Sequence, residues 1–348
     1  MTRRLVVWMY AEDAPLWTMP DQAVEEIRSA LGEGWEVESV RVPLDATGDG
    51  ARTTPPEVIA AVRDAEIYCG WGIRPQLFEA ARSLRWFHSG AAGVRASLFG
   101  AMRVSDVIFT NSAGAYSEPL AEHALAAIFH FSRALDVAVR AQREARWVQR
   151  DLIAAGSPLQ AGGEVGGSTL GIVGYGGTGR TLARKAAALG MKVQAVRRTA
   201  ADPELPGHLS GCSPPEGLRD LLGTSDYIVL AAPETAATRK MIGADEVGAM
   251  KAGAVFINLS RGSLVDDAPL IAALRAGQLR GAALDVFRTE PLPPDSPWWE
   301  LENVLVTPHV GGTSGHFWRR QTGLILRNVG RYLAGRRLEN LVNKEAGY

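Results

Sequence analysis

The sequence predicts an α/β protein of two domains, each built on an open sheet of parallel strands. Its 348 residues are more than one core of ordinary size organises, so two domains with a cleft between them are expected. Short apolar runs alternate with helical segments along the chain, as they do in open α/β sheets. A glycine-rich loop near the middle follows one of these runs and opens a helix.

The N-terminal part begins this alternation. We expect a strand at residues 5–10, a helix at 21–31 and a second strand at 35–42, because apolar runs flank a segment of helical periodicity. Similar units follow, and the apolar run 84–87 ends at the loop Gly90-Ala91-Ala92-Gly93. A glycine loop at a strand end can turn backbone N–H groups towards an anion. By default, such a loop is only a turn.

The character of the chain changes near its middle. Residues 117–135 are continuously helical in character, and a polar, arginine-rich and then glycine-rich stretch follows to residue 167. We interpret this region as the crossing between the domains and an exposed arm. A strand at 168–173, a helix at 180–189 and a strand at 192–196 then form one strand-helix-strand unit.

The remaining strands are short and weakly alternating, which suits a buried parallel sheet. They are expected at residues 227–231, 254–259, 281–287 and 304–307. Residues 318–334 predict a last amphipathic helix, which we expect to pack on the other domain.

The glycine-rich loop reads Gly174-Tyr175-Gly176-Gly177-Thr178-Gly179. A GxGxxG pattern between a strand and a helix predicts a dinucleotide-binding, or Rossmann, domain. The first glycine permits the tight turn, Gly176 lets the backbone approach a pyrophosphate, and Gly179 lets the helix pack on the strand. The helix N-terminus favours the negative charge. The alternative is a glycine-rich turn that binds no nucleotide.

The end of the second strand of this unit predicts the choice of cofactor. NAD-preferring domains place Asp or Glu here, roughly 20 residues after the loop, to bind the ribose hydroxyls. This chain has Arg197-Arg198-Thr199, two guanidinium groups and a hydroxyl that can bind a 2′-phosphate. We therefore expect NADP(H) to be preferred, with NAD(H) possible. The alternative is a solvated surface cluster of arginines.

Three ionisable residues, Arg261, Glu290 and His309, follow three of the later strands, where ligands of open α/β sheets bind. As a group they suit hydride transfer to a 2-oxo acid. Arginine can hold the carboxylate and polarise the carbonyl, and histidine can deliver a proton. A carboxylate bonded to the imidazole would fix its tautomer and favour its protonated form. Taken singly, each residue is explained as well by a surface charge or a loop histidine.

The composition narrows the classes of function. Lys plus Arg (37) nearly balances Asp plus Glu (38), so there is no electrostatic case for a nucleic acid or an anionic membrane as partner. Cys69 and Cys212 have neither disulfide nor metal-ligand spacing, and no metal is expected. No apolar run reaches the length of a membrane span or a signal peptide. A cytoplasmic protein is expected.

Several motifs resemble those of the D-isomer-specific 2-hydroxyacid dehydrogenase family. They are Asn258-Leu259-Ser260-Arg261-Gly262, Leu284-Asp285-Val286-Phe287 with Glu290-Pro291, and Thr307-Pro308-His309. The similarity extends from about residue 84 to 312, whereas the first 80 residues match only in outline. A second strand that ends in arginine and Ser or Thr resembles the NADPH-preferring glyoxylate/hydroxypyruvate reductases of the family.

The resemblance implies a fold, an assembly and a substrate. A flavodoxin-like substrate domain would comprise residues 1–112 and a returning segment, 313–348, with the Rossmann cofactor domain, 113–312, inserted between them. Homodimers are usual in the family. The substrate would be a small 2-oxo or 2-hydroxy acid, here glyoxylate or hydroxypyruvate.

The resemblance also assigns residues. The catalytic arginine, glutamate and histidine of the family carry over to Arg261, Glu290 and His309, and Asp285 would bind the nicotinamide carboxamide. The other expected cofactor contacts are Tyr175, Gly176, Gly177, Thr178, Arg197, Arg198, Thr199, Ala232, Pro233, Thr238, Leu259, Ser260 and Gly311. The expected substrate contacts are Trp71, Ser89, Gly90, Ala91, Ala92 and Gly93.

Some residues depart from the family's commoner ones, and rival functions stay open. Gly177-Thr178, His88 and Trp298 are departures that leave the substrate open, and His88 and His123 receive no role. One rival is a co-repressor-like binding protein on the same fold. Another is formate or phosphite oxidation: formate dehydrogenases of the family have Gln in place of Glu290, whereas phosphite oxidation is disfavoured only by the expected NADP(H) preference.

Overall fold

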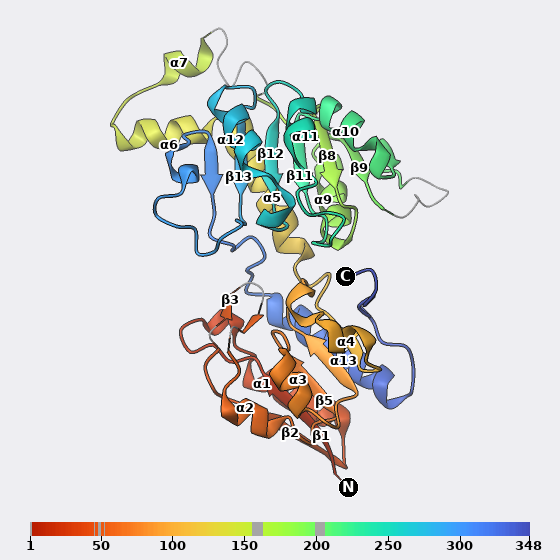
Figure 1. Ribbon diagram of the computed structural model, residues 1–348. Coiled ribbons are helices and arrows are strands. Elements are labelled where there is room, and N and C mark those ends of the chain that lie inside the picture. Colours follow the sequence, from red (N-terminus) through yellow and green to blue (C-terminus); the bar gives the residue numbers. More distant parts are fainter. Residues whose placement is uncertain (1, 45, 48–49, 52, 155–162, 199–205) are drawn as a thin grey trace. The chain divides into compact units, whose positions relative to one another are not determined.

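The computed structural model describes residues 2–44, 46–47, 50–51, 53–154, 163–198 and 206–348. The chain forms two compact units, one of residues 1–116 with 313–348 and the other of residues 117–312. Each unit has its own parallel sheet (Figure 1). The predicted fold class is confirmed: two open parallel-sheet domains, with a Rossmann domain inserted into a flavodoxin-like one.

The first unit has a parallel sheet with the strand order β2-β1-β5-β6-β7, which is the flavodoxin-like order. Its strands are β1 (Arg3–Trp8), β2 (Trp35–Ser39), β5 (Ile67–Gly70), β6 (Trp86–Ser89) and β7 (Ile108–Thr110), and a short hairpin joins β3 (Ala46–Thr47) to β4 (Gly50–Ala51). Its helices are α1 (Asp21–Leu31), α2 (Pro56–Ala61), α3 (Pro75–Ala80), α4 (Gly100–Val104) and α13 (Phe317–Leu333), with short 3-10 turns at Pro15–Trp17 and Arg95–Ser97.

Side chains of β1 alternate between the two faces of this sheet, as the period of a strand requires. Leu5 and Val7 join the core that α1 and α13 cover. Val6 and Trp8 join the core on the opposite face, under α2, α3 and α4. The C-terminal helix α13 is therefore an integral layer of the first unit.

The second unit has a seven-stranded sheet with the order β10-β9-β8-β11-β12-β13-β14, the Rossmann order with one further strand. Its strands are β8 (Thr169–Val173), β9 (Lys192–Val196), β10 (Gly211–Ser213), β11 (Tyr227–Leu230), β12 (Val255–Asn258), β13 (Gly281–Leu284) and β14 (Val304–Val306). Its helices are α5 (Ser117–Ser132), α6 (Leu135–Arg143), α7 (Gln149–Ile153), α9 (Gly177–Ala188), α10 (Leu218–Thr224), α11 (Ala244–Ala249) and α12 (Asp267–Arg275), with 3-10 turns at Pro215–Gly217, Gly262–Leu264 and Pro297–Glu300.

Two cores sandwich this second sheet. Ile128 of α5 and Leu182 of α9 belong to the core on one face. The opposite core includes Leu222 of α10, Val247 of α11 and Leu270 of α12. Helices lie on both sides of this sheet (Figure 1), so the sheet is buried on both faces, as its short apolar strands require.

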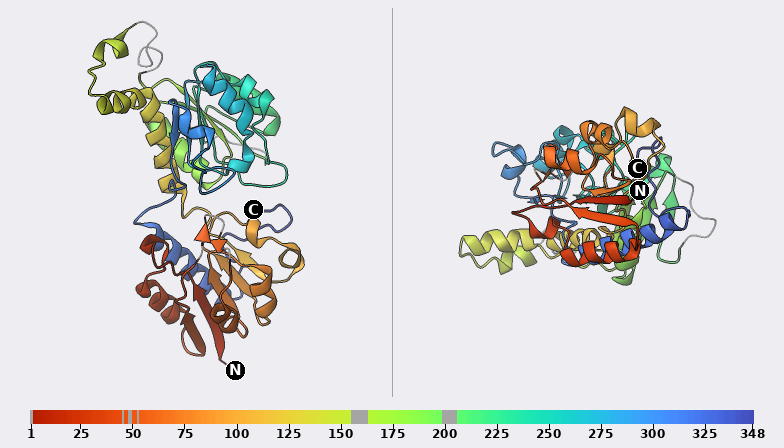
Figure 2. Two further views of the ribbon diagram at one scale, coloured as in Figure 1. Left: turned by 60° about the vertical axis from the view of Figure 1, so that its left-hand side comes forward. Right: turned by 90° about the horizontal axis from the view of Figure 1, so that it is seen from below.

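The prediction of one continuous helix over residues 117–135 is wrong. Helix α5 ends at Ser132, and α6 begins after Ala134, whose φ of 50° is left-handed and cannot continue a right-handed helix. The chain therefore turns, and α6 and α7 lead away from the sheet as an arm (Figures 1 and 2). Asp136 fastens α6 to the sheet, because its carboxylate accepts hydrogen bonds of 2.7 and 2.8 Å from Arg280.

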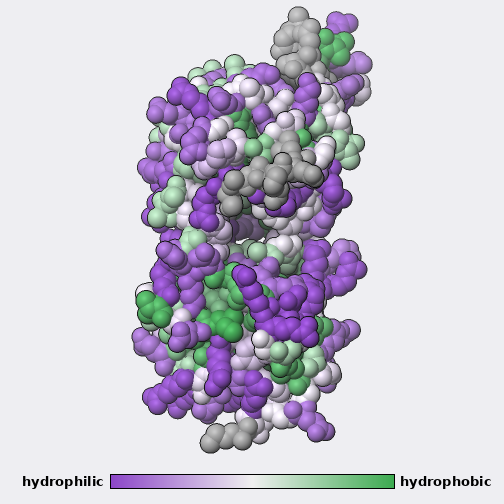
Figure 3. Space-filling view, turned by 90° about the vertical axis from the view of Figure 1, so that its right-hand side faces the viewer, coloured by the Kyte–Doolittle hydropathy of each residue, from purple (hydrophilic) through white to green (hydrophobic). Residues whose placement is uncertain are grey.

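The arm, residues 135–154, exposes large apolar side chains. Trp147 is 88% exposed and Ile153 is 73% exposed, and hydrophobic residues are visible at the top of Figure 3, where the arm ends. Leu135 and Val139 of α6 are also exposed. No helix among the described residues, including those of the arm, has both the length and the apolar character needed to cross a membrane.

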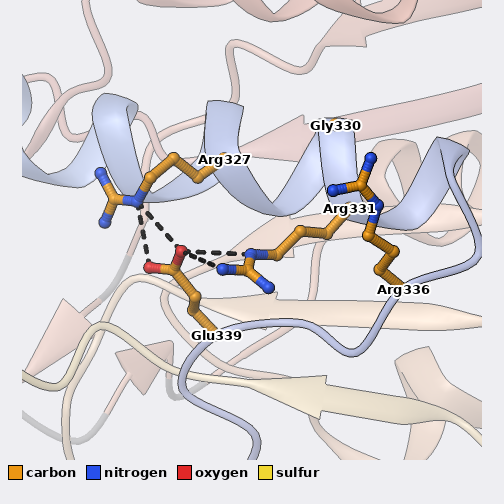
Figure 4. Close-up of a pocket in the computed structure, with 5 residues that line it drawn as sticks. All are labelled: Arg327, Gly330, Arg331, Arg336 and Glu339. Atoms are coloured by element: carbon orange, nitrogen blue, oxygen red, sulfur yellow. Dashed lines mark hydrogen bonds and ion pairs between the residues drawn. The ribbon is translucent and has the colours of Figure 1, made fainter.

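A surface hollow of the first unit lies where the chain returns from α13. Arg327, Gly330, Arg331, Arg336 and Glu339 line it (Figure 4). Arg327 and Arg331 donate hydrogen bonds of 3.0 and 3.2 Å to the Glu339 carboxylate, and the hydrogen bond from Arg327 is the main reason that the pKa of Glu339 is lowered. These pairs join the segment after α13 to the helix, and none of the predicted site residues is among them.

Candidate active site

The glycine-rich loop connects β8 to α9. Gly174 has a φ of 105°, and a Cβ on it would lie 2.6 Å from backbone atoms of Ala231 and Ala232, so only glycine fits this turn. Gly179 lies against the carbonyl of Gly174, which is the close approach of helix and strand expected there. The loop therefore has the backbone geometry of a dinucleotide-binding turn.

Backbone donors of this loop are available to an anion. Within the described part of the chain, the N–H groups of Gly176, Gly177 and Thr178 donate to no acceptor. They stand at the N-terminus of α9, a helix of 12 residues, whose dipole adds positive potential. The residues present thus fit the pyrophosphate of a dinucleotide.

The predicted cofactor residues near this loop are brought together with it. Tyr175 is buried, and its hydroxyl lies 2.8 Å from Nε2 of His208. Arg197 and Arg198 follow β9, which pairs with β8 up to the loop. Arg197 is half-buried and its backbone N–H donates to the carbonyl of Ser213, whereas Arg198 is exposed. Thr199 lies outside the described residues.

The carboxyl ends of β11 and β12 place the next predicted residues. The Ser260 hydroxyl donates a hydrogen bond to the carbonyl of Ala232, and the Thr238 hydroxyl donates one of 2.7 Å to the carbonyl of Pro233. Leu259 is buried. The Ser260 hydrogen bond joins the ends of the two strands, and the Thr238 hydrogen bond holds the segment after β11.

Asn258 stands in a recognised motif but received no role from the sequence, and its side chain holds the turn that carries Arg261. Its side-chain oxygen accepts from the backbone N–H of Ser260 at 3.0 Å, and its amide donates to the carbonyl of Arg261 at 3.1 Å. A buried amide at the end of an apolar strand was the signal, because buried polar groups need partners.

Glu290 and His309 form a direct pair. Nδ1 of His309 lies 2.7 Å from one carboxylate oxygen of Glu290, and the backbone N–H of Phe287 donates to the other at 2.8 Å. Because a carboxylate only accepts, Nδ1 carries the hydrogen. Among the described residues, the Nε2 atom of His309 has no hydrogen-bond partner, so it can contact a ligand.

The positive charge of Arg261 also affects the pKa of Glu290. Burial by itself would raise the pKa of the Glu290 carboxyl, but hydrogen bonds from His309 and Phe287 and the charges of His309 and Arg261 outweigh it, so the pKa is lowered. Arg261 is therefore close enough to act on Glu290. The structure brings all three predicted catalytic residues together in the second unit.

Asp285 and Gly311, two more predicted cofactor residues, are in contact close to His309. Asp285 follows β13 and is 2% exposed, and one of its oxygens accepts a hydrogen bond of 2.9 Å from the backbone N–H of Gly311. Thr307 and His123 complete this contact. Neither received a role from the sequence, although Thr307 stands in a recognised motif.

The predicted substrate loop lies in the first unit, at the end of β6. The Tyr116 hydroxyl donates to the carbonyl of Gly90 at 2.7 Å, and the Asn111 amide donates to that of Ala92 at 2.8 Å. The Ser89 hydroxyl oxygen accepts from the N–H of Ala91. Within the described residues, the N–H groups of Ala92 and Gly93 donate to no acceptor, as an anion-binding loop requires.

Two other residues of the first unit that the sequence singles out are buried. Trp71 is 7% exposed and stacks on Phe317, with ring centroids 5.8 Å apart, and its ring also packs on Gly90. His88 is fully buried, with Nδ1 at 2.8 Å from the Thr110 hydroxyl and Nε2 at 3.0 Å from the Gln321 amide. In the second unit, Trp298 belongs to the core.

A parallel sheet with a dinucleotide turn, and a histidine–carboxylate pair at its carboxyl edge beside an arginine, define the chain as a nicotinamide-dinucleotide-dependent oxidoreductase. Comparison with known proteins narrows this class. The family model described as D-isomer specific 2-hydroxyacid dehydrogenase, NAD binding domain, matches residues 125–311. The chain belongs to this family and is a D-2-hydroxyacid dehydrogenase.

Relatives cover nearly the whole chain. A glyoxylate reductase of Korarchaeum cryptofilum is 33% identical over 308 residues, which are 87% of this chain and 90% of the relative. The solved D-isomer specific 2-hydroxyacid dehydrogenase of Xanthobacter autotrophicus, in complex with NADPH and MES, has a TM-score of 0.78 at 29% identity and covers 100% of both chains. An NADPH-dependent glyoxylate/hydroxypyruvate reductase of Sinorhizobium meliloti, in complex with NADP and sulfate, has a TM-score of 0.78 at 26% identity over 99% of this chain and 100% of that one.

Proposed function

We propose that this enzyme reduces a small 2-oxo acid with NADPH and that Arg261, Glu290 and His309 are its catalytic residues. The observation that carries the proposal is the 2.7 Å contact of His309 Nδ1 with Glu290. It fixes the imidazole through one nitrogen and presents the other as the proton donor.

The three residues have different tasks in the reaction. When bound, NADPH supplies the hydride that the carbonyl carbon accepts. His309 gives the proton on Nε2 to the carbonyl oxygen, so the C=O bond becomes C–H and O–H. Glu290 stabilises the imidazolium before transfer, and Arg261 polarises the carbonyl and pairs with the carboxylate of the acid.

The preference for NADP(H) rests on Arg197 and Arg198. Both follow the strand next to the dinucleotide turn, where a 2′-phosphate on the adenosine ribose needs cationic partners. The reductase of Sinorhizobium meliloti described above, whose structure contains NADP, supports this choice of cofactor.

We propose glyoxylate or hydroxypyruvate as the substrate. The glyoxylate reductase relative supports a two- or three-carbon 2-oxo acid. The N–H groups of Ala92 and Gly93, which have no acceptor in the described residues, would bind its carboxylate, with Ser89, Gly90 and Ala91 shaping the loop. The Trp71 ring packs against Gly90, so we expect Trp71 to support the conformation of this loop.

We also propose that two copies associate through the arm. Trp147 and Ile153 are among its most exposed side chains, and apolar surface of this kind is rarely left to water. Asp136 anchors the base of the arm through Arg280. The arm is therefore fixed at its base and apolar towards its end, which are properties expected of a segment that contacts a second copy of the chain.

Steady-state kinetics test the proposed cofactor and substrate. Purified enzyme should oxidise NADPH with glyoxylate or hydroxypyruvate, and more efficiently than NADH. Replacing both Arg197 and Arg198 with Ala should raise the KM for NADPH by roughly tenfold or more while changing that for NADH little, because charge-assisted bonds to the 2′-phosphate are lost.

Three outcomes would contradict the proposal. Equal losses for NADPH and NADH in the double variant would remove the cofactor preference. Stoichiometric NADPH binding without turnover of any 2-oxo acid would favour a regulatory binding protein. Reduction of NADP by phosphite, with none of the 2-oxo acids reduced, would favour a dehydrogenase of that inorganic anion on the same scaffold.

A further inference from the structure

The turn that presents His309 has an unusual backbone. Residues 307–311 follow β14, and His309 has a φ of 55°, a left-handed conformation that only a few per cent of non-glycine residues adopt. Its backbone N–H donates to the carbonyl of Thr307 at 3.0 Å. Such a conformation persists only where surrounding contacts determine it.

One buried carboxylate supplies these contacts. An oxygen of Asp285 accepts hydrogen bonds from the Thr307 hydroxyl at 2.7 Å and from the backbone N–H of Val310 at 3.0 Å. The other oxygen accepts from the backbone N–H of Gly311 at 2.9 Å. A carboxylate has about four acceptor positions. The turn on both sides of His309 therefore takes most of the capacity of Asp285.

His123 of α5 extends this contact by one hydrogen bond. Its Nε2 lies 3.1 Å from the Thr307 hydroxyl oxygen. Since the single hydroxyl hydrogen of Thr307 goes to Asp285, that oxygen must accept from His123, so Nε2 of His123 carries a hydrogen. The three side chains form one chain of donors that ends on the carboxylate.

Packing leaves this arrangement little freedom. A Cβ on Gly311 would lie 2.8 Å from the Asp285 carboxylate and 3.3 Å from the His123 ring. Glycine is therefore needed for the turn to reach the carboxylate. On its other side, His309 is held by Glu290 through Nδ1, so the ring and the backbone of the same residue are fixed independently.

We propose that Asp285, Thr307 and His123 are positioning residues that hold the His309 turn in place for proton transfer. Asp285 then serves the proton donor through the protein's own backbone, in addition to any contact with the cofactor. This inference rests on the proposed role of His309 as the acid.

Hydrogen exchange tests the positioning without any turnover. In the wild-type chain, the backbone amides of Val310 and Gly311 should exchange slowly. In Asp285→Asn they should exchange at least about tenfold faster, because an amide side chain offers fewer acceptor positions to them. Unchanged exchange would overturn the proposal, and this result stands whether or not His309 proves to be the acid.

Kinetics with matched hydroxyl variants test the consequence for catalysis. Thr307→Val should lower kcat by about tenfold or more, with the Kd for NADPH within about twofold, and Thr307→Ser should restore most of the rate. Thr224→Val makes the same chemical change on α10, where the hydroxyl contacts Gln194 and the carbonyl of Asp220, and should leave kcat unchanged.

Two further measurements separate positioning of His309 from a general structural role and from contact with the cofactor. In a His309→Ala background, Thr307→Val should cause no further loss of kcat, whereas an additive loss would mean a general structural role. Asp285→Asn should also lower kcat, and an NADPH analogue with an acetyl group in place of the carboxamide should leave this loss of kcat as large as it is with NADPH. Disappearance of that loss would show that Asp285 acts through the carboxamide alone.

Discussion

At the scale of single residues, burial decides the charge of His88. The ring is fully buried, and desolvation lowers its pKa to about 3. The Gln321 amide N–H donates to Nε2, so Nδ1 carries the hydrogen and donates to the Thr110 hydroxyl. Thr110 also accepts from the indole of Trp86 at 2.8 Å. This network lies directly below the loop that begins at Ser89.

Acid should therefore destabilise the chain through His88. An unfolded histidine binds its proton near pH 6.5, and the folded one only near pH 3. Between these values the unfolded state holds one more proton, so the contribution of His88 is full above pH 6.5 and is lost as the pH falls, by at most about 5 kcal/mol. Urea unfolding at pH 7.5 and 4.5 measures this change.

The matched variant for that experiment is His88→Gln, which does not titrate. Its stability should fall less between pH 7.5 and 4.5 than that of the wild type. If both chains lose the same free energy of unfolding over this interval, His88 is not the group that senses acid.

Removal of the proposed proton donor should affect chemistry and spare binding. His309→Ala is expected to lower kcat by about 10²- to 10⁴-fold at neutral pH, while the Kd for NADPH, measured by fluorescence titration, stays within about twofold. Because hydrogen bonds and nearby positive charges lower the pKa of Glu290 in spite of its burial, that carboxylate stays ionised at neutral pH and cannot replace the lost acid. A variant with most of its wild-type kcat would rule out His309 as the donor.

The sequence could predict the Glu290 and His309 pair because both stand in motifs with known partners. It could not predict that Thr307 and Gly311 bind Asp285, since those residues are 22 and 26 positions away along the chain. Contacts of this kind depend on how neighbouring strands end in space. Motifs therefore indicate the reacting groups, whereas the residues that place them become visible only in the fold.

At the scale of elements, local patterns predicted regular segments well. The helix expected at residues 21–31 and the strand expected at 192–196 have the bounds of α1 and β9, because each is a short periodic run with clear ends. The break after Ser132 left no such signal. Alanine is the best helix former, yet Ala134 is left-handed, and Asp136 just after it is bonded to Arg280.

The ion pair of Asp136 with Arg280 should contribute most to holding α6 in this position. The Asp136 carboxylate is 5% exposed and the Arg280 side chain 21%, so Asp136→Asn leaves a mostly buried guanidinium without its charged partner. We expect a loss of about 3 kcal/mol in the free energy of unfolding, seen as a lower thermal midpoint.

An exposed ion pair provides the control for this variant. Glu25, on α1, pairs with Arg28 and is 64% exposed, so Glu25→Gln should cost less than about 0.5 kcal/mol. Equal shifts of the thermal midpoint in the two variants would mean that burial does not strengthen the Asp136 pair.

At the scale of the whole molecule, the arm should decide the state of association. Replacing Trp147 and Ile153 with Ser removes two of its most exposed apolar side chains, and sedimentation velocity should then report a monomer where the wild type sediments as a dimer. A wild-type monomer, or an unchanged dimer in the variant, would contradict the proposed association through the arm.

The two units differ in which of the proposed site residues they contain, and this affects how the protein can evolve. The dinucleotide turn, Arg261, Glu290 and His309 all lie in the inserted unit, which begins and ends within residues 117–312. The host unit contains the loop after β6 and none of the three proposed catalytic side chains. Substitutions in the host unit outside that loop therefore leave the three proposed catalytic side chains unchanged. Under the proposed function, such a division separates the residues of the reaction from the loop that binds the acid, so each can change by mutation without altering the other's sequence.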